Sequence, residues 1–162
     1  MKIVIAGSRS ITDYATMKKA ILASNIWKDY GKKIVVYSGK EPKGVDRLGE
    51  EFATKAGLKI KAKPAKWDDI KAPGAVVRTR RDGKQYNVLA GFWRNAEMAD
   101  EADMALIVWD GKSPGSLDML HQMRMREKPV ILYPLRIAVD MYDSLTAKDV
   151  EIILPEGLTP DK

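Results

Sequence analysis

The chain has 162 residues, of which 45% are hydrophobic and 31% charged, a composition that predicts one compact globular domain over residues 1–162. It has no cysteine, which excludes disulfides, thiolate catalysis and cysteine-based zinc sites, and its one histidine argues against a histidine-rich metal site. The net charge of +6 is compatible with nucleic acid or with small anionic ligands and does not choose between them. We therefore expect no metal and no resident cofactor.

No segment is long and apolar enough to span a membrane. The sequence begins directly with a strand-like run over residues 2–6, without the basic and apolar regions of a signal peptide. These features predict a cytoplasmic, soluble protein that has no membrane partner.

Short apolar strands alternate with amphipathic helices over the first 63 residues, the pattern of βαβ units. The predicted strands are Ile3–Ala6 and Ile34–Tyr37, and Thr12 is the predicted cap of the helix between them. A second helix is expected to end at Gly57 in the left-handed conformation. Leu58–Lys63 then alternates apolar residues with lysines, which predicts an edge strand whose lysines form a solvated face.

Residues 74–90 interrupt this rhythm. Two short runs flank Asp82-Gly83, a dipeptide typical of a tight turn, and together they predict a β-hairpin inserted into the α/β pattern. The hairpin is basic, because half of the net charge of +6 lies within seven of its residues. Its charged residues are Arg78, Arg80, Arg81 and Lys84, with Asp82.

After the hairpin the alternation resumes with predicted helices at Trp93–Glu101 and Ser116–Arg126 and predicted strands at Met104–Trp109 and Val130–Tyr133. In the tail, Val139–Leu145 fits a helix and Val150–Leu154 fits a strand; we interpret residues 135–162 as a C-terminal extension. The whole pattern predicts an α/β fold: a Rossmann-like three-layer sandwich with a mainly parallel sheet of order 3-2-1-4-5 and an inserted basic β-hairpin.

The loops after the first, second and fourth strands each contain glycine and serine and lead into a helix. In a parallel sheet such loops converge where ligands bind, although each loop alone also fits an ordinary turn. Ser113 and Pro114 fit the start of a helix, which leaves the N–H groups of Gly115 and Ser116 free for a phosphate. The residues expected to bind a ligand are Gly7, Ser8, Arg9, Ser38, Gly39, Gly44, Asp46, Arg94, Asn95, Asp110, Gly111, Ser113, Gly115 and Ser116.

Three of the residues near this point have alternative roles. Arg94 fits either a clamp on a phosphate or an ion pair with Glu97 or Asp100 on its own helix. Asp110 fits either an acceptor for a ribose hydroxyl or a cap for the following turn. Trp109, at the end of a predicted strand, is a candidate for stacking on a base.

These motifs together resemble the SLOG superfamily, in the branch of small Rossmann-like proteins related to YspA and YpsA that occur in bacteria and their phages. The resemblance covers about residues 1–134. It implies a Rossmann-like fold that binds nucleotides or their derivatives, and it implies dimerisation, which is common among such proteins. The motifs that carry it are Gly7-Ser-Arg9, Ser38-Gly39, Gly44-Val-Asp46, Gly91-x-x-Arg94-Asn95-x-x-Met98, Ala102-Asp103 and Trp109-Asp-Gly-x-Ser113-x-Gly115-Ser116.

The wider superfamily includes the lonely-guy phosphoribohydrolases, DprA-like DNA-binding proteins and nucleotide-sensing domains. The hydrolases use an arginine, matched here by Arg94, and a Pro-Gly-Gly-x-Gly-Thr-x-x-Glu loop whose glutamate position is occupied here by Met119. Methionine can neither stabilise an oxocarbenium-like state nor activate water, so lonely-guy-type catalysis is disfavoured. If the protein is nevertheless an enzyme, the candidate catalytic residues are Arg94, Asp46 and Asp110.

The sequence contains neither a Walker A loop nor a Gly-x-Gly-x-x-Gly fingerprint, which disfavours ATP hydrolysis and ordinary dinucleotide oxidoreductase chemistry. The leading hypothesis is binding of a nucleoside phosphate, an ADP-ribose- or NAD-like derivative or a cyclic nucleotide, with the basic hairpin as a lid that adds Arg78, Arg80 or Arg81. One alternative is an N-glycosidase acting on nucleoside 5′-monophosphates. Another is a single-stranded nucleic-acid-binding module, against which we count the lack of interleaved aromatic and basic residues on one exposed strand face.

Overall fold

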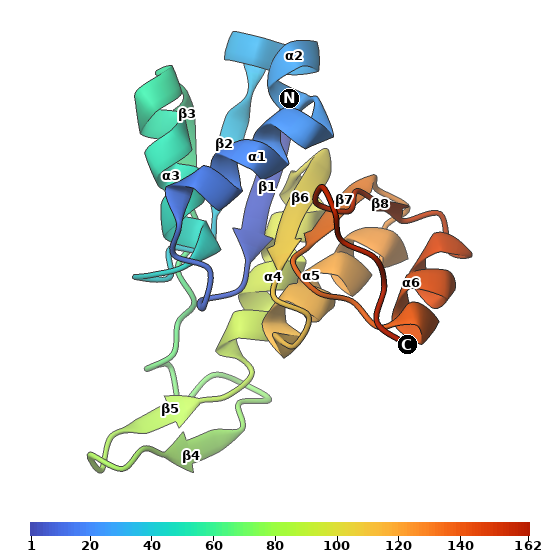
Figure 1. The fold of residues 1–162 in the computed structure, drawn as a ribbon. Helices are drawn as coiled ribbons and strands as arrows, with labels where there is room; N and C mark the ends of the chain where they lie inside the picture. Colours follow the sequence, from blue (N-terminus) through green and yellow to red (C-terminus); the bar gives the residue numbers. More distant parts are fainter.

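The computed structural model describes residues 1–162 as an open β-sheet with helices on both faces (Figure 1). All pairs of neighbouring strands in this sheet are parallel. The predicted Rossmann-like α/β fold is confirmed, and the order of its first five strands is the predicted one, with a short sixth strand added at the edge. In spatial order the strands are β3 (Lys59–Ala62), β2 (Val35–Ser38), β1 (Lys2–Gly7), β6 (Met104–Trp109), β7 (Val130–Pro134) and β8 (Glu151–Ile152).

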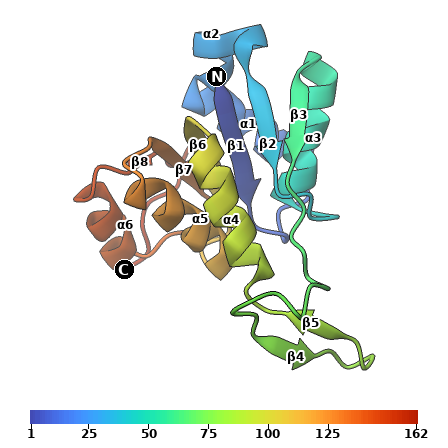
Figure 2. The same cartoon turned by 180° about the vertical axis from the view of Figure 1, so that it is seen from behind.

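The helices form two layers, one on each face of the sheet (Figures 1 and 2). One layer contains α1 (Tyr14–Ser24), α2 (Ile26–Tyr30), a short 3-10 turn (Gly31–Lys33) and α3 (Val45–Ala56). The opposite layer contains α4 (Ala90–Glu101), α5 (Pro114–Met125) and α6 (Val139–Thr146). None of the helices is long and apolar enough to cross a membrane.

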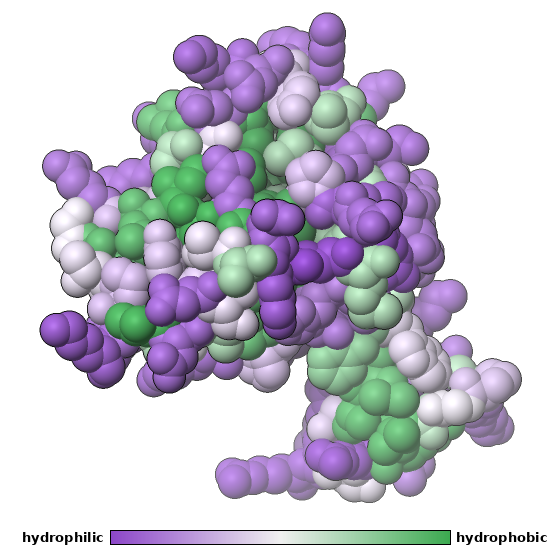
Figure 3. Space-filling model, turned by 90° about the vertical axis from the view of Figure 1, so that its right-hand side faces the viewer, coloured by the Kyte–Doolittle hydropathy of each residue, from purple (hydrophilic) through white to green (hydrophobic).

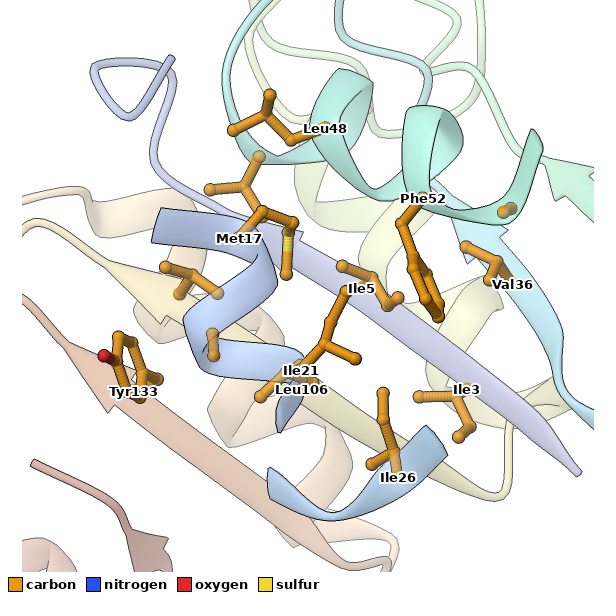
Figure 4. Packing of buried hydrophobic residues seen from close by; sticks show 14 of the residues in the cluster. Ile3, Ile5, Met17, Ile21, Ile26, Val36, Leu48, Phe52, Leu106 and Tyr133 are labelled. Carbon is orange, nitrogen blue, oxygen red and sulfur yellow. The ribbon is translucent and has the colours of Figure 1, made fainter. Parts of the chain in front are cut away.

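The core lies on both faces of the central strands. Along β1, Ile3 and Ile5 pack against the layer of α1 and α3, as Figure 4 shows, whereas Val4 packs against the opposite layer. Every residue of β6 is buried. Uninterrupted apolar runs of this kind are typical of parallel strands that are covered on both sides.

Two predicted element ends are corrected by the structure. Asp13, rather than Thr12, caps α1, because its carboxylate accepts a hydrogen bond of 3.0 Å from the N–H of Ala15. The strand predicted at Val150–Leu154 is reduced to the two residues of β8, which pair with β7.

The lysines of β3 do not all lie on a solvated face. Lys59 and Lys61 are exposed, as predicted. Lys63, just beyond the strand, instead forms ion pairs with Glu97 (3.0 Å) and Glu101 (2.6 Å). These contacts join the end of β3 to α4, so this lysine has a structural role.

The predicted hairpin is present as a separate antiparallel pair formed by β4 (Val77–Thr79) and β5 (Gln85–Asn87). It extends away from the main sheet, beyond the carboxyl ends of the strands, and immediately precedes α4 (Figures 1 and 2). The buried amide oxygen of Asn87 accepts hydrogen bonds from the N–H groups of Val76 (3.2 Å) and Leu89 (3.1 Å), which fix the base of the hairpin. Figure 3 shows the resulting lobe, on which both hydrophobic and hydrophilic side chains reach the surface.

Candidate ligand-binding cavity

A cavity of about 410 Å³ lies beyond the carboxyl ends of the strands. Its walls come from the end of β1, the loops after β1, β2 and β6, the start of α3, residues of α4 and α5, and the segments on either side of the hairpin. The order of strands reverses between β1 and β6, so the cavity occupies the point where open α/β sheets bind ligands. Of the residues predicted to bind a ligand, those that line the cavity are Gly7, Arg9, Asp46, Arg94, Asn95, Asp110, Ser113, Gly115 and Ser116.

The start of α5 presents free N–H groups to the cavity. Ser113 occupies the N-cap position and Pro114 the first helical position, and the hydroxyl of Ser116 donates to that of Ser113 (3.1 Å). The backbone N–H groups of Gly115 and Ser116 donate no hydrogen bond within the chain. Free N–H groups and the helix dipole make such a terminus attractive to an anion.

Asp110 fixes the loop that leads into α5. Its carboxylate accepts hydrogen bonds from the N–H groups of Lys112 and Ser113 (2.9 Å each) and from the hydroxyl of Ser10 (2.7 Å). Its own N–H donates to the buried hydroxyl of Ser8 (2.9 Å). Burial alone would raise the pKa of Asp110, but these hydrogen bonds outweigh it and lower the pKa to about 2. Asp110 is therefore an ionised cap of the turn, which was one of its two predicted roles.

The prediction that Trp109 stacks on a base was wrong. Its side chain is 3% exposed, and its indole N–H donates to the carbonyl of Ser113 (3.0 Å). Trp109 therefore stabilises the loop that leads into α5 from within the core. Trp67 and Phe92 line the cavity instead. Gly91 makes room for Trp67, since a Cβ at Gly91 would lie 2.9 Å from its ring. No local spacing in the sequence signals this contact, which is why we missed it.

Arg94 joins three segments of the chain. Its guanidinium donates to the backbone carbonyls of Gly39 and Lys63 (3.4 Å for the latter) and to the side-chain oxygen of Asn95 (3.1 Å). Its remaining nitrogen lies 3.5 Å from the carboxylate of Glu41. Most of its hydrogen-bonding capacity therefore holds the ends of β2 and β3 against α4.

Glu41 was not predicted as a site residue, yet it stands between two arginines at the cavity. Its carboxylate lies 2.9 Å from the guanidinium of Arg9 as well as 3.5 Å from that of Arg94. The alternative prediction, that Arg94 pairs with Glu97 or Asp100, was wrong, because those acids pair with other side chains. The cavity thus contains two arginines whose shared counterion is a carboxylate of the same chain.

Asp46 is a buried carboxyl group in the cavity wall, only 6% exposed. Its carboxylate accepts a hydrogen bond of 3.3 Å from the N–H of Glu41. Burial raises the pKa of Asp46 to about 6, although the positive charge of Arg94 acts in the opposite direction. This group can accept or release a proton close to neutral pH.

Several predicted ligand-binding residues do not line the cavity and instead stabilise the loops around it. The hydroxyl of Ser38 donates to Glu50 (2.8 Å). Gly44 has a φ of +85°, and a Cβ there would lie 2.7 Å from the carbonyl oxygen of Ser8. The hairpin arginines proposed as a lid also do not line the cavity in this structure. The predicted site residues that do not line it are Ser8, Ser38, Gly39, Gly44 and Gly111.

Met119, at the position of the hydrolase glutamate, lines the cavity and is 1% exposed. The neighbouring Asp118 does not replace the missing carboxylate, because it lies outside the lining and accepts a hydrogen bond of 3.0 Å from Asn95. Carboxylate chemistry in the cavity is therefore limited to Glu41, Asp46 and Asp110. The chain has no group of three or more histidine or acidic side chains arranged to hold a metal ion.

No family model and no curated protein matches the sequence. Among solved structures, the molybdenum cofactor binding protein of Rippkaea orientalis is similar, with a TM-score of 0.59 and 18% identity over 93% of this chain and 87% of that one. DNA processing protein A (DprA) from Streptococcus pneumoniae has a TM-score of 0.64 and 19% identity over 94% of this chain and 58% of that one. DprA from Helicobacter pylori, whose structure concerns single-stranded DNA binding, has a TM-score of 0.56 and 18% identity over 94% of this chain and 75% of that one.

At these levels of identity the similarity concerns the fold alone. The chain shares a Rossmann-like α/β architecture with a cofactor-binding protein and with two DNA processing proteins.

Proposed function

We propose that the cavity binds a nucleotide or a nucleotide-derived ligand: a nucleoside phosphate, an ADP-ribose- or NAD-like derivative or a cyclic nucleotide. The observation that carries the proposal is the start of α5, where Gly115 and Ser116 line a cavity of about 410 Å³ and their N–H groups donate no hydrogen bond within the chain. A volume of this size falls in the range of small-molecule sites.

The cavity offers a suitable group for each part of such a ligand. A phosphate fits the start of α5, and Arg9 also lines the cavity; its side chain is 58% exposed, and its one ion pair, with Glu41, is exchangeable for a phosphate. A base fits against the rings of Trp67 and Phe92, which also line the cavity. Asp110 also lines the cavity, and beyond its role as the cap of the turn its carboxylate can accept a hydrogen bond from a ribose hydroxyl.

The structural neighbours support a binding role. One is described as binding the molybdenum cofactor, and the H. pylori protein as binding single-stranded DNA. These descriptions favour a ligand-binding function for this fold.

Thermal unfolding with a ligand panel at one salt concentration tests the proposal. The panel contains nucleoside mono- and triphosphates, ADP-ribose, NAD and cyclic dinucleotides. A ligand at a hundred times its dissociation constant adds about 2.7 kcal/mol, which raises the midpoint by roughly 5–10 °C for a chain of this length.

The matched variants are Arg9→Ala, which removes a cavity arginine, and Arg47→Ala, which removes an exposed arginine of α3 outside the cavity. We expect the first to reduce the shift and the second to leave it unchanged. The proposal fails if no small nucleotide gives a selective shift, or if the two variants behave alike.

A second candidate function, hydrolysis of the N-glycosidic bond of a nucleoside 5′-monophosphate, is favoured by one observation. Asp46 combines a place in the cavity wall with a pKa of about 6, which suits a general acid or base at neutral pH. The unmodified protein should then release free base from a nucleoside 5′-monophosphate, as detected by chromatography. Asp46→Asn and Arg94→Ala should both lose this release. Ligand binding without base release would leave binding as the function.

A further inference from the structure

One face of the β4–β5 hairpin carries alternating cationic and aromatic side chains. The pairing of the two strands places Arg78 directly opposite Tyr86. Arg80 follows the end of β4 at Thr79, and its contact with Tyr86 places it on the same side as Arg78. The guanidinium of Arg80 stacks over the ring of Tyr86, with its central carbon 4.7 Å from the ring centroid. The hairpin therefore brings one aromatic ring between two arginines on a single face, an arrangement that the sequence alone did not reveal.

This face continues the aromatic wall of the cavity. The ring of Tyr86 lies 6.4 Å from that of Trp67, centroid to centroid, with the two planes tilted by 60°. Trp67 in turn lines the cavity. A row of flat groups, formed by Trp67, Tyr86 and the guanidinium of Arg80, thus leads from the cavity out along the hairpin.

The charges of the hairpin are available to a partner. Arg78 and Arg80 are exposed, and neither forms an ion pair within the chain. Arg81 and Lys84 add two exposed positive charges at the turn, against the single carboxylate of Asp82. The whole hairpin projects from the body of the molecule, so a long ligand can lie along it (Figures 1 and 2).

We propose that the face formed by Arg78, Arg80 and Tyr86 binds a single-stranded nucleic acid, of which one nucleotide occupies the cavity. The inference rests on the proposed function for that one nucleotide. Arginines neutralise backbone phosphates, and flat side chains stack on bases of any sequence. A single strand fits better than a duplex because its base faces are free to stack, whereas duplex bases already stack on one another.

Fluorescence anisotropy with labelled twelve-nucleotide oligo(dU) and oligo(U) tests the inference across a range of salt concentrations. The double variant Arg78→Ala/Arg80→Ala should bind about tenfold or more weakly. Each phosphate neutralised on a single strand contributes about 0.7 to the slope of log affinity against log salt, so the slope should become shallower by roughly 1.4. Tyr86→Ala should also weaken binding, but without changing the slope, because stacking releases no counterions.

The matched control is Lys18→Ala/Lys19→Ala, which removes two exposed charges of α1, away from the hairpin and the cavity. We expect it to bind the oligonucleotides nearly as well as the unmodified protein. An equal loss in the two double variants would overturn the inference, because it would show attraction to overall charge alone. Tighter binding of a duplex of the same length would overturn it as well.

Stabilisation by a mononucleotide separates this inference from the proposed function. Hairpin variants that lose the oligonucleotide but are still stabilised by a mononucleotide support both. If the oligonucleotide binds in a hairpin-dependent way and no mononucleotide stabilises the protein, nucleotide binding in the cavity is refuted. Binding of nucleic acid by the hairpin face is then still supported. A preference between oligo(dU) and oligo(U), which differ only in the 2′-hydroxyl, would name DNA or RNA as the natural partner if it is lost in Arg78→Ala/Arg80→Ala.

Discussion

The carboxylate of Glu41 lies 2.9 Å from the guanidinium of Arg9, and its other oxygen lies 3.5 Å from Arg94. A phosphate that approaches these arginines must therefore compete with a carboxylate of the same chain. Glu41→Gln should raise the affinity for nucleoside phosphates about three- to tenfold, because it removes one repulsive charge and releases Arg9 from an ion pair of modest strength. Isothermal titration calorimetry measures this change.

Glu51→Gln is the control for that experiment, since it removes an acid of α3 that pairs with Lys55 outside the cavity. It should leave the affinity unchanged. Weaker binding in Glu41→Gln than in the unmodified protein would mean instead that Glu41 holds the ligand directly, as an acceptor for a hydroxyl group.

The buried carboxyl of Asp46 makes stability depend on pH. Its pKa is raised from 3.8 to about 6 in the folded state, so the ionised form is less favourable in the folded chain than in the unfolded one. Well below pH 3.8 both states are protonated and there is no penalty. Between pH 3.8 and about 6 the unfolded state loses its proton first, and stability falls by about 3 kcal/mol. Asp46→Asn lacks this loss.

Urea unfolding at several pH values from 4 to 7 measures the effect. The free energy of unfolding of Asp46→Asn, relative to the unmodified protein, should rise across the window from pH 4 to 6 and then level off. A difference that stays constant with pH would show that Asp46 ionises normally in the folded state.

Trp109→Phe tests the support under the start of α5. The substitution removes the indole N–H that donates to Ser113 and leaves a small void in a site that is 3% exposed. We expect a loss of about 1–3 kcal/mol in the free energy of unfolding, together with weaker nucleotide binding. Trp93→Phe, at a position that is 40% exposed, should have little effect on either quantity.

Gly44→Ala tests the backbone of the loop before α3. Gly44 has a φ of +85°, and an added Cβ would lie 2.7 Å from the oxygen of Ser8 and closer still to the backbone of Arg9. The variant should lose about 1–3 kcal/mol in chemical denaturation because of strain and displacement of the Arg9 loop. Gly115→Ala is the comparison, because its Cβ meets nothing within 4 Å and a helical alanine is up to about 1 kcal/mol more favourable than glycine. Equal losses in both would disprove the strain argument.

The sheet was predictable because its strands are short apolar runs separated by helical periodicity, and β6 is the clearest example. The residue that caps α1 could not be predicted, because Thr12 and Asp13 are adjacent and both residue types cap helices well.

The start of α5 was also predictable, because Ser113, Pro114 and Gly115 act through local backbone geometry. The aromatic wall formed by Trp67 and Phe92 could not be predicted, because Trp67 packs against Gly91, which is distant in the sequence. The error at Trp109 has a related cause: a side chain at the end of a strand points to the core or to the cavity depending on how the neighbouring helix covers it.

Each loop of the cavity is held by a group from another segment: Ser8 holds the N–H of Asp110, Arg94 holds the carbonyl of Gly39, and Asn95 donates to the carbonyl of Gly115. Effects of substitutions at such linked positions should depart from additivity. In evolutionary terms, a lineage that acquires a new ligand cannot remodel one loop at a time. Its substitutions should occur in pairs, in which the supporting residue changes together with the loop that it supports.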